Sequence, residues 1–415
     1  MTTSYQEIEV YDDDNEPVTI QENEIVTHYY KSKNYGGNLQ AYAMCKAIEK
    51  LGYTAEQLCF TSEKEMSSEI PKQEKKLKIK KLKIAVKVLV YNILYFVRHP
   101  KVYNMLRQRS KAVFMFNQNV IPHSRECYKE SDIINSVKSY DLFITGSDMV
   151  WSPDMFSDTF FLNFVPVDIP KFSYAPSIGV TSLTDKEQKI FRSFLKSYQA
   201  VSVREHNAIS LLKKISPVSV EWVLDPTLIL EREEWDEICS KRIIKEPYLF
   251  CYFLGNNIES RKSAEEYAKA QNLKLVTIPY LLGGYRRCDC NFGDIQLSKI
   301  SPPDFISLIR YSEAVFTDSF HACVFSFLYQ RDMFAFRRNA EDRWGSRIYS
   351  FLELIGCVSR YCDTHEKESM DYIETLPKID YKTPFVDFEI IKKKSLDYLE
   401  KNLRKAEETI ENNEQ

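Results

Sequence analysis

Five short segments of the sequence hold polar side chains or glycines at places where chemistry could occur. Each of them follows a run of apolar residues that predicts a β-strand. They are Tyr35-Gly36-Gly37-Asn38, Gly146-Ser147-Asp148, Arg204-Glu205, Asp318-Ser319-Phe320-His321 and Trp344-Gly345-Ser346-Arg347. Ligands of parallel α/β sheets bind outside the carboxyl ends of the strands, so we expect all five at the functional edge.

The segment 318–321 joins a predicted strand to a predicted helix. The first amides of a helix have no partner within the helix and favour an anion. Ser319 could cap these amides and His321 could add a charged hydrogen bond, so the segment suits a phosphate group. The alternative is that Asp318 or Ser319 only caps the helix and that His321 is a half-buried, satisfied imidazole.

Three further side chains could handle a substrate. Arg204 ends a predicted strand, and arginine binds a carboxylate or phosphate in a two-pronged fashion. The alternative for Arg204 is an ion pair with Glu205 or another acid, and Arg347 is open to the same two interpretations. Asp148 could orient or deprotonate a hydroxyl group, or it could bond its own backbone in a turn.

The glycine pair Gly36-Gly37 allows the backbone to approach a ligand closely, although glycine pairs more often form turns. It is not a dinucleotide-binding fingerprint, because the third glycine is missing. The sequence also lacks Gly-x-Ser-x-Gly, a P-loop and His-Glu-x-x-His. Hydrolase, nucleoside triphosphatase and zinc protease functions therefore have no support.

The elements that must position these residues are alternating strands and helices. The expected strands are 25–30, 141–145, 171–175, 200–203, 248–254, 273–278, 314–317 and 332–336. The expected helices are 38–51, 184–197, 205–214, 260–271, one opening at 301–304, 320–329, 347–355 and 389–408. Such alternation predicts the α/β class with parallel sheets covered by helices on both faces.

A break near residue 225 divides the alternation into two runs, which suits the length of 415 residues. We therefore expect an N-terminal Rossmann-like domain over 1–225 and a second over 226–385. A C-terminal helix and tail follow over 386–415. A site between the two domains would draw on loops of both.

Residues 61–119 interrupt the first expected domain. Within 71–112 there are thirteen Lys or Arg and a single acid, Glu74. The apolar run 84–96 is too short to span a bilayer, but a cationic, apolar helix can lie on an anionic membrane surface. The alternative is an insertion that packs on its own domain and keeps its lysines in solvent.

Composition excludes some broader classes. The net charge of -3 argues against a nucleic-acid-binding protein. The ten cysteines are scattered and no secretory signal is visible at the start, so we expect reduced thiols in the cytoplasm. Cys288 and Cys290 are a close pair without a second pair at zinc-site spacing, and we expect no metal there.

Six segments together resemble the polysaccharide pyruvyltransferase family, and they occur in the family's order between about residues 34 and 356. Three lie in the first half: Asn34-Tyr35-Gly36-Gly37-Asn38-Leu39-Gln40-Ala41-Tyr42-Ala43, Gly146-Ser147-Asp148-Met149-Val150-Trp151 and Tyr174-Ala175-Pro176-Ser177-Ile178-Gly179. The others are Val201-Ser202-Val203-Arg204-Glu205, Val223-Leu224-Asp225-Pro226-Thr227 and Thr317-Asp318-Ser319-Phe320-His321-Ala322-Cys323-Val324-Phe325. Each is weak alone, but six in order make a specific match.

The resemblance implies two domains arranged as in the GT-B glycosyltransferases, with the site in the cleft between them. It implies phosphoenolpyruvate as donor, no cofactor, and a pair of sugar hydroxyls as acceptor. The product is then a pyruvate ketal on a saccharide of a capsule, exopolysaccharide or cell-wall glycan. We expect a lipid-linked acceptor at the inner face of the membrane, with the basic stretch 71–112 as the contact.

The resemblance also assigns roles to residues. Arg204 and His321 match the family's donor-binding Arg and His, and we place Ser319, Phe320 and Arg347 beside them. Asp148 joins His321 as a candidate for catalysis. To the acceptor side and the cleft we assign six residues: Asn34, Tyr35, Gly36, Gly37, Asn38 and Ser147.

Three positions depart from the family's pattern: Met149 stands where Gln is common, Ala322 where Gly is common, and Pro176 within the usual Tyr-Ala-Ala-Ser stretch. None removes a charged group, but together they leave the acceptor open. Two other functions remain as alternatives. One is a GT-B-type glycosyltransferase that uses a nucleotide sugar, and the other is a catalytically silent binding protein.

Overall fold

The first half of the chain forms a parallel sheet in the computed structural model, which describes residues 22–61, 100–153, 156–282, 286–338 and 345–414. The strands lie in the order β3-β2-β1-β4-β5. Their bounds are β1 Glu22–Val26, β2 Thr54–Thr61, β3 His123–Lys129, β4 Leu142–Thr145 and β5 Lys171–Ser173. A bridge between Phe172 and Ala200 places a parallel pair beside β5, formed by β6 Val201–Val203 and β7 Val220–Trp222.

The second half forms a six-stranded parallel sheet in the order β10-β9-β8-β11-β12-β13. Its strands are β8 Tyr248–Tyr252, β9 Lys274–Thr277, β10 Ile295–Gln296, β11 Ala314–Thr317, β12 Asp332–Phe336 and β13 Tyr361–Cys362. In each sheet the first strand along the chain, β1 or β8, is central. The next two strands lie on one side of it and the later strands on the other, which is the doubly wound order. The predicted α/β class with two Rossmann-like domains is therefore confirmed, while the GT-B-like arrangement stays a prediction.

Helices connect the strands and cover the sheets. In the first half they are α1 Tyr35–Glu49, α3 Pro100–Asn119, α4 Asp185–Phe194, α5 His206–Leu212, α6 Pro226–Ile229 and α7 Arg232–Ile238. In the second half they are α8 Ile258–Ala270, α9 Pro302–Arg310, α10 Phe320–Leu328, α11 Gly345–Leu354, α12 Met370–Thr375 and α13 Val386–Glu414. The start of α9 follows from its sequence, since Ser301 and Asp304 form a capping box and Pro302 follows the cap.

The segment 61–119 is more than an added insertion. Its described part, α3, buries Arg109, which donates to the carbonyl oxygen of Lys33 in the first domain and the Tyr252 hydroxyl in the second. The strands β2 and β3 that flank the segment were not predicted. Much of β3 is exposed and polar, so it lacks the apolar alternation of a half-buried strand. The apolar run 84–96 lies outside the described residues.

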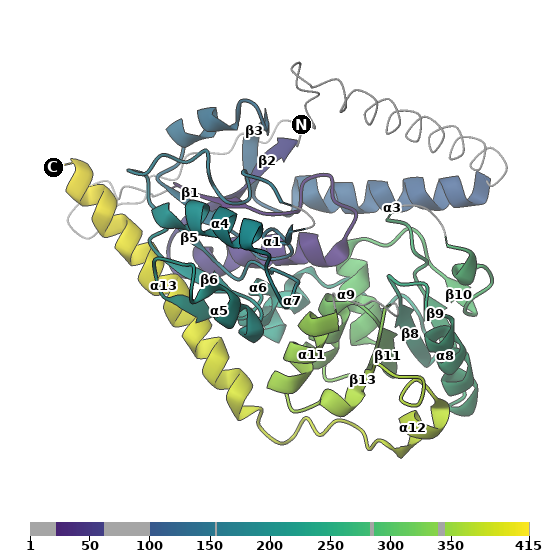
Figure 1. Cartoon of the computed structure of the whole chain (residues 1–415). Helices are drawn as coiled ribbons and strands as arrows, with labels where there is room; N and C mark the ends of the chain where they lie inside the picture. The colour runs from purple at the N-terminus through teal and green to yellow at the C-terminus, as the bar shows by residue number, and fades with distance from the viewer. Residues whose placement is uncertain (1–21, 62–99, 154–155, 283–285, 339–344, 415) are drawn as a thin grey trace, which may run out of the picture.

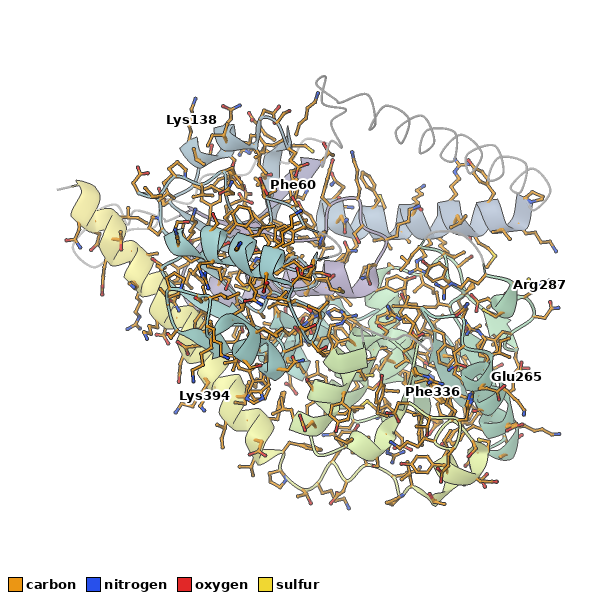
Figure 2. The ribbon with its side chains drawn as sticks, viewed as in Figure 1. Phe60, Lys138, Glu265, Arg287, Phe336 and Lys394 are labelled. Carbon is orange, nitrogen blue, oxygen red and sulfur yellow. The ribbon has the colours of Figure 1, made fainter. Side chains whose placement is uncertain are left out.

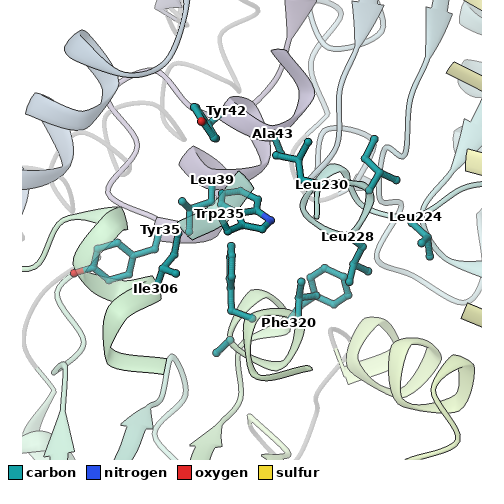
Figure 3. Close-up of a cluster of buried hydrophobic side chains, with 14 of the residues drawn as sticks. Tyr35, Leu39, Tyr42, Ala43, Leu224, Leu228, Leu230, Trp235, Ile306 and Phe320 are labelled. Atoms are coloured by element: carbon teal, nitrogen blue, oxygen red, sulfur yellow. The ribbon is translucent and has the colours of Figure 1, made fainter. Parts of the chain in front are cut away.

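One apolar cluster joins the two domains. The ring of Tyr35 stacks on Phe305 of α9 at 4.9 Å between centroids, and Trp235 of α7 meets Phe325 of α10 edge-on, also at 4.9 Å. Figure 3 shows Tyr35 of α1 together with Trp235 of α7, Ile306 of α9 and Phe320 of α10. The two domains are thus held by a continuous hydrophobic core.

The C-terminal helix α13 returns to the first domain and lies along it (Figure 1). The Tyr398 hydroxyl donates to the carbonyl oxygen of Ser173 at 3.0 Å, and Ser395 accepts a bond from the amide of Leu224 at 2.8 Å. Within the described ranges, no helix combines the length and apolar character needed to span a bilayer.

Candidate active site

A fully buried carboxylate, Asp225, is the centre of the candidate site. It is the N-cap of α6, and its Oδ1 accepts from the amide and the hydroxyl of Thr227 at 3.0 and 2.7 Å. Its Oδ2 accepts from Ser147 Oγ and Arg204 Nη1, both at 2.8 Å, and lies 3.6 Å from His321 Nε2. Burial alone would raise the pKa of Asp225, but His321 and Arg204 hold it well below its usual range.

Arg204 follows β6 and is held from several sides. Its Nε donates to Glu205 at 3.1 Å, and its guanidinium lies 4.6 Å from the centre of the Phe320 ring. Burial would lower its pKa, but Glu205 and Asp225 raise it, so the side chain stays charged. Its buried Nη2 makes no hydrogen bond to any described residue, which leaves a donor available for an anion.

His321 lies in the first turn of α10 and contacts the start of α1. A Cβ placed on Gly36 would be 2.0 Å from His321 Nδ1 and 2.4 Å from its Cγ. Since real atoms do not come this close, only glycine at position 36 admits the imidazole. The predicted close approach at the glycine pair thus exists, but a side chain of the other domain occupies it in this structure.

A narrow cavity lies between Arg204 and Arg347, in the first turn of α11. Its wall contains residues of both domains, among them Asp225, Phe320 and Phe351. Burial and the nearby guanidinium groups of Arg204 and Arg338 lower the pKa of Arg347 to about 10, against the opposite effect of Asp148 and Glu205. Arg347 therefore remains protonated at neutral pH, on the same cavity wall as Arg204 and the carboxylates of Glu205 and Asp225.

Asp148 follows β4 and is almost completely buried. Its backbone is left-handed, with φ of 66°, which is uncommon for a residue other than glycine. This turn brings its carboxylate to Gly37, where an added Cβ would lie 3.3 Å from Asp148 Oδ2. Burial acts to lower the pKa of Arg204 and of Arg347, and the Asp148 carboxylate opposes this effect in both.

Asp318 follows β11, which has the same position in the second sheet as β4 has in the first. Its carboxylate accepts from the amides of Leu254 and Gly255, just after β8, at 2.6 Å each. Ser319 stands at the N-cap position of α10, but its side chain makes no capping bond, so that part of the prediction is wrong. Thr317 Oγ1 instead accepts from the amide of Ser319 at 3.0 Å.

The remaining predicted residues have packing and supporting contacts. The Tyr35 hydroxyl donates to the carbonyl oxygen of Ile300 inside the domain interface. Asn34 caps α1 by accepting from the amide of Gly36, and Asn38 donates back to the carbonyl oxygen of Asn34 at 2.6 Å. Ser147 contacts Asp225, as described above. In the glycine pair, Gly36 lies against the His321 imidazole and Gly37 against the Asp148 carboxylate.

Three residues near the site were not singled out from the sequence. Asp225 lies in one of the family-like segments, and its place between an apolar run and a proline was the available signal. Arg338 donates to the carbonyl oxygen of Asp318 at 3.0 Å. His28, two residues after β1, packs against Phe160 with ring centroids 4.0 Å apart and the rings tilted by 53°. For these last two the sequence carried no motif.

The described residues contain no group of three or more His, Cys, Asp or Glu placed to hold a metal ion. All ten cysteines lie in described segments and are free thiols. Asp289, between Cys288 and Cys290, pairs instead with Arg261 at 2.7 Å.

Two doubly wound domains with buried arginines and carboxylates on one cavity between them define the class as an α/β protein with a charged interdomain site. The sequence profile of the family described as polysaccharide pyruvyl transferase matches residues 34–339. The chain therefore belongs to this family, whose members transfer a pyruvyl group. No curated protein sequence matches the chain.

Several solved structures are similar at low identity. The UDP-GlcNAc 2-epimerase of Methanocaldococcus jannaschii has a TM-score of 0.49 and 10% identity, covering 88% of this chain and 94% of its own. The UDP-GlcNAc 2-epimerase of Neisseria meningitidis has 0.48 and 9%, covering 93% and 100%. MurG of Acinetobacter baumannii has 0.43 and 9%, covering 93% and 99%. We draw nothing about substrates from likenesses this distant.

The contact between Gly36 and His321 yields a test. In Gly36→Ala the new methyl group must displace the imidazole, and a shift of about 1 Å in a catalytic group can cost about a hundredfold in rate. We expect pyruvyl transfer to fall by that order while the protein stays folded. Gly52→Ala is the control for a loss of stability away from the site, because Gly52 has a left-handed backbone with φ of 90° but nothing within 4 Å of its added Cβ. Equal activity of the two variants would contradict a role for the position of His321.

Proposed function

We propose that the protein transfers the pyruvyl group of phosphoenolpyruvate to two hydroxyls of one sugar, forming a pyruvate ketal on a lipid-linked polysaccharide precursor. The observation that carries the proposal is the pair Arg204 and Arg347 on the wall of one cavity, with His321 3.6 Å from Asp225, which lies on the same wall. The cavity has a volume of about 20 Å³, so side chains around it must move to admit the donor. Phosphoenolpyruvate presents a carboxylate and a phosphate on a small frame. Two fixed guanidinium groups match these two anionic groups in number and in chemistry.

The proposed reaction has four steps. The methylene carbon of the donor gains a proton, and one sugar hydroxyl adds to the neighbouring carbon. Phosphate then leaves, and the second hydroxyl closes the ketal ring. Arg204, Arg347 and His321 stabilise the departing phosphate and hold the carboxylate, while Asp148 orients a hydroxyl group.

A nucleotide-sugar glycosyltransferase is the alternative that the fold permits. In the doubly wound fold, a diphosphate would be expected at the crevice between β8 and β11. There the carboxylate of Asp318 already occupies the amides of Leu254 and Gly255. A phosphate at the same amides would meet this buried negative charge, which favours the smaller donor beside Arg204.

The direct test uses the purified protein, phosphoenolpyruvate and a lipid-linked saccharide. We expect mass spectrometry to show the saccharide gaining one pyruvate ketal, with one phosphate released for each product molecule. A parallel reaction with a uridine diphosphate sugar should give no product. Sugar transfer in that reaction, without any ketal from phosphoenolpyruvate, would overturn the proposal.

Variants of the donor site form the second test. Loss of one preorganised hydrogen-bond donor costs about 3–4 kcal/mol, or a hundred- to thousandfold in rate. We expect this loss in His321→Ala and in Arg204→Ala, and also in Arg204→Lys, which keeps the charge but loses the two-pronged geometry. Arg287→Ala is the control, because Arg287 is exposed at the surface (Figure 2). Normal turnover in a folded donor-site variant would remove that residue from the mechanism.

We also propose that the basic stretch 71–112 holds the enzyme at the inner face of the membrane. Its described part, α3, exposes Lys101, Arg107 and Lys111 on the side away from the core. Phe114 and Met115 lie on the same side and are 48% and 49% exposed. A face that combines cations with large apolar side chains suits an anionic lipid surface.

Liposome flotation tests this contact. We expect the protein to float with vesicles that contain anionic lipid and to remain in the bottom fraction when the vesicles are neutral. Each cation near an anionic surface contributes roughly 1 kcal/mol to the free energy of binding. The double variant Arg107→Gln, Lys111→Gln should float less. Lys393→Gln, Lys394→Gln on α13 is the matched control with the same charge change (Figure 2). Flotation that is the same with anionic and with neutral vesicles would contradict the membrane proposal.

A further inference from the structure

His28 lies at the topological switch point of the first sheet. It follows β1 by two residues, and β1 pairs with β2 on one side and β4 on the other. Chain connections after these central strands leave in opposite directions, which opens a crevice at their carboxyl ends. Asp148 follows β4 at the same crevice. No motif in the sequence pointed to His28, and the donor site described above does not use it.

The surroundings of His28 leave one nitrogen for a ligand. Its ring packs on Phe160, and its buried Nε2 has no hydrogen-bond partner among the described residues. A buried polar atom without a partner is costly in a folded protein, and such atoms often mark functional sites. The backbone carbonyl of His28 and the Asp148 carboxylate both lie against Gly37, 2.8 and 3.3 Å from an added Cβ.

The protonation state of His28 suits a base. Burial lowers the pKa of its imidazole, and the Asp148 carboxylate opposes this effect only in part. A neutral imidazole at neutral pH has a lone pair that can accept a proton. Once protonated, the ring would be stabilised by the carboxylate of Asp148, which is the arrangement that a general base requires.

The proposed reaction needs such a group, because both acceptor hydroxyls lose a proton. Over the whole reaction, the donor carbon gains one proton to become a methyl group and phosphate leaves with another, so two protons gained match two lost. Arg204 and Arg347 are cations and cannot accept them. His321 lies next to the Asp225 carboxylate, on the donor side.

We propose that His28 Nε2 is the base that takes the proton from one acceptor hydroxyl, with Asp148 stabilising the imidazolium. The O–H bond breaks as the hydroxyl oxygen forms its bond to the central carbon of the donor, and the imidazole later releases the proton to solvent. This inference rests on the proposed function. It places the sugar at the carboxyl ends of β1 and β4, beside Gly37, and the donor at Arg204 and Arg347.

The experiment compares His28→Gln with His206→Gln in the full-length protein. His206 is exposed and packs on Trp222, so its substitution is the matched control. We expect His28→Gln to lower kcat about a hundred- to ten-thousandfold, the range of general base catalysis, with thermal stability and KM for phosphoenolpyruvate nearly unchanged. The control should keep normal turnover. Turnover of His28→Gln within a few-fold of the wild type would overturn the inference.

Chemical rescue separates a proton-transfer role from a structural one. In His28→Ala, added imidazole should restore part of the turnover, since it can occupy the space of the lost ring and accept the proton. A folded His28→Ala variant that stays inactive at all imidazole concentrations would refute the base. A wild-type enzyme that makes no ketal from phosphoenolpyruvate would instead refute the proposed function, so the two failures are distinguishable.

Discussion

The structure of the site depends on the burial of one negative charge. A carboxylate inside a protein costs several kcal/mol unless it is paired and hydrogen-bonded, and Asp225 is satisfied by four groups from different parts of the chain. Removing this carboxylate would leave the buried Arg204 guanidinium without one of its two counter-charges and would remove the carboxylate beside His321. The same residue therefore fixes the loop after β4, the end of β6 and the start of α10 in one arrangement.

This pairing also explains how an arginine can be buried and still be ready for a ligand. Glu205 and Asp225 hold Nε and Nη1 of Arg204, and the Phe320 ring fixes the plane of the guanidinium. Only Nη2 is left without such a bond. Donors that are fixed before the substrate arrives need little reorganisation during the reaction, which is the main source of electrostatic catalysis.

The sequence predicted elements where local signals were strong. The strands β11 and β12 match their expected bounds, because each is a short apolar run that polar residues terminate. In contrast, β3 and α3 are polar or strongly charged, and their packing partners lie far away in the chain. The ends of the strands placed Arg204, Asp148 and His321 at one edge. Tertiary contacts decided the rest, since nothing local shows that Asp225 receives Arg204 and His321 or that His28 faces the crevice.

The continuous apolar core between the domains has a mechanical consequence. Domains that meet through small polar surfaces can rotate about a hinge, but here Tyr35, Trp235 and Phe320 are buried in one shared cluster. Rotation would expose this cluster to water, at a cost of roughly 25 cal/mol for each Å² of apolar surface. The molecule should therefore behave as a single stiff body, and substrates would enter through local movements of loops and side chains around a static frame.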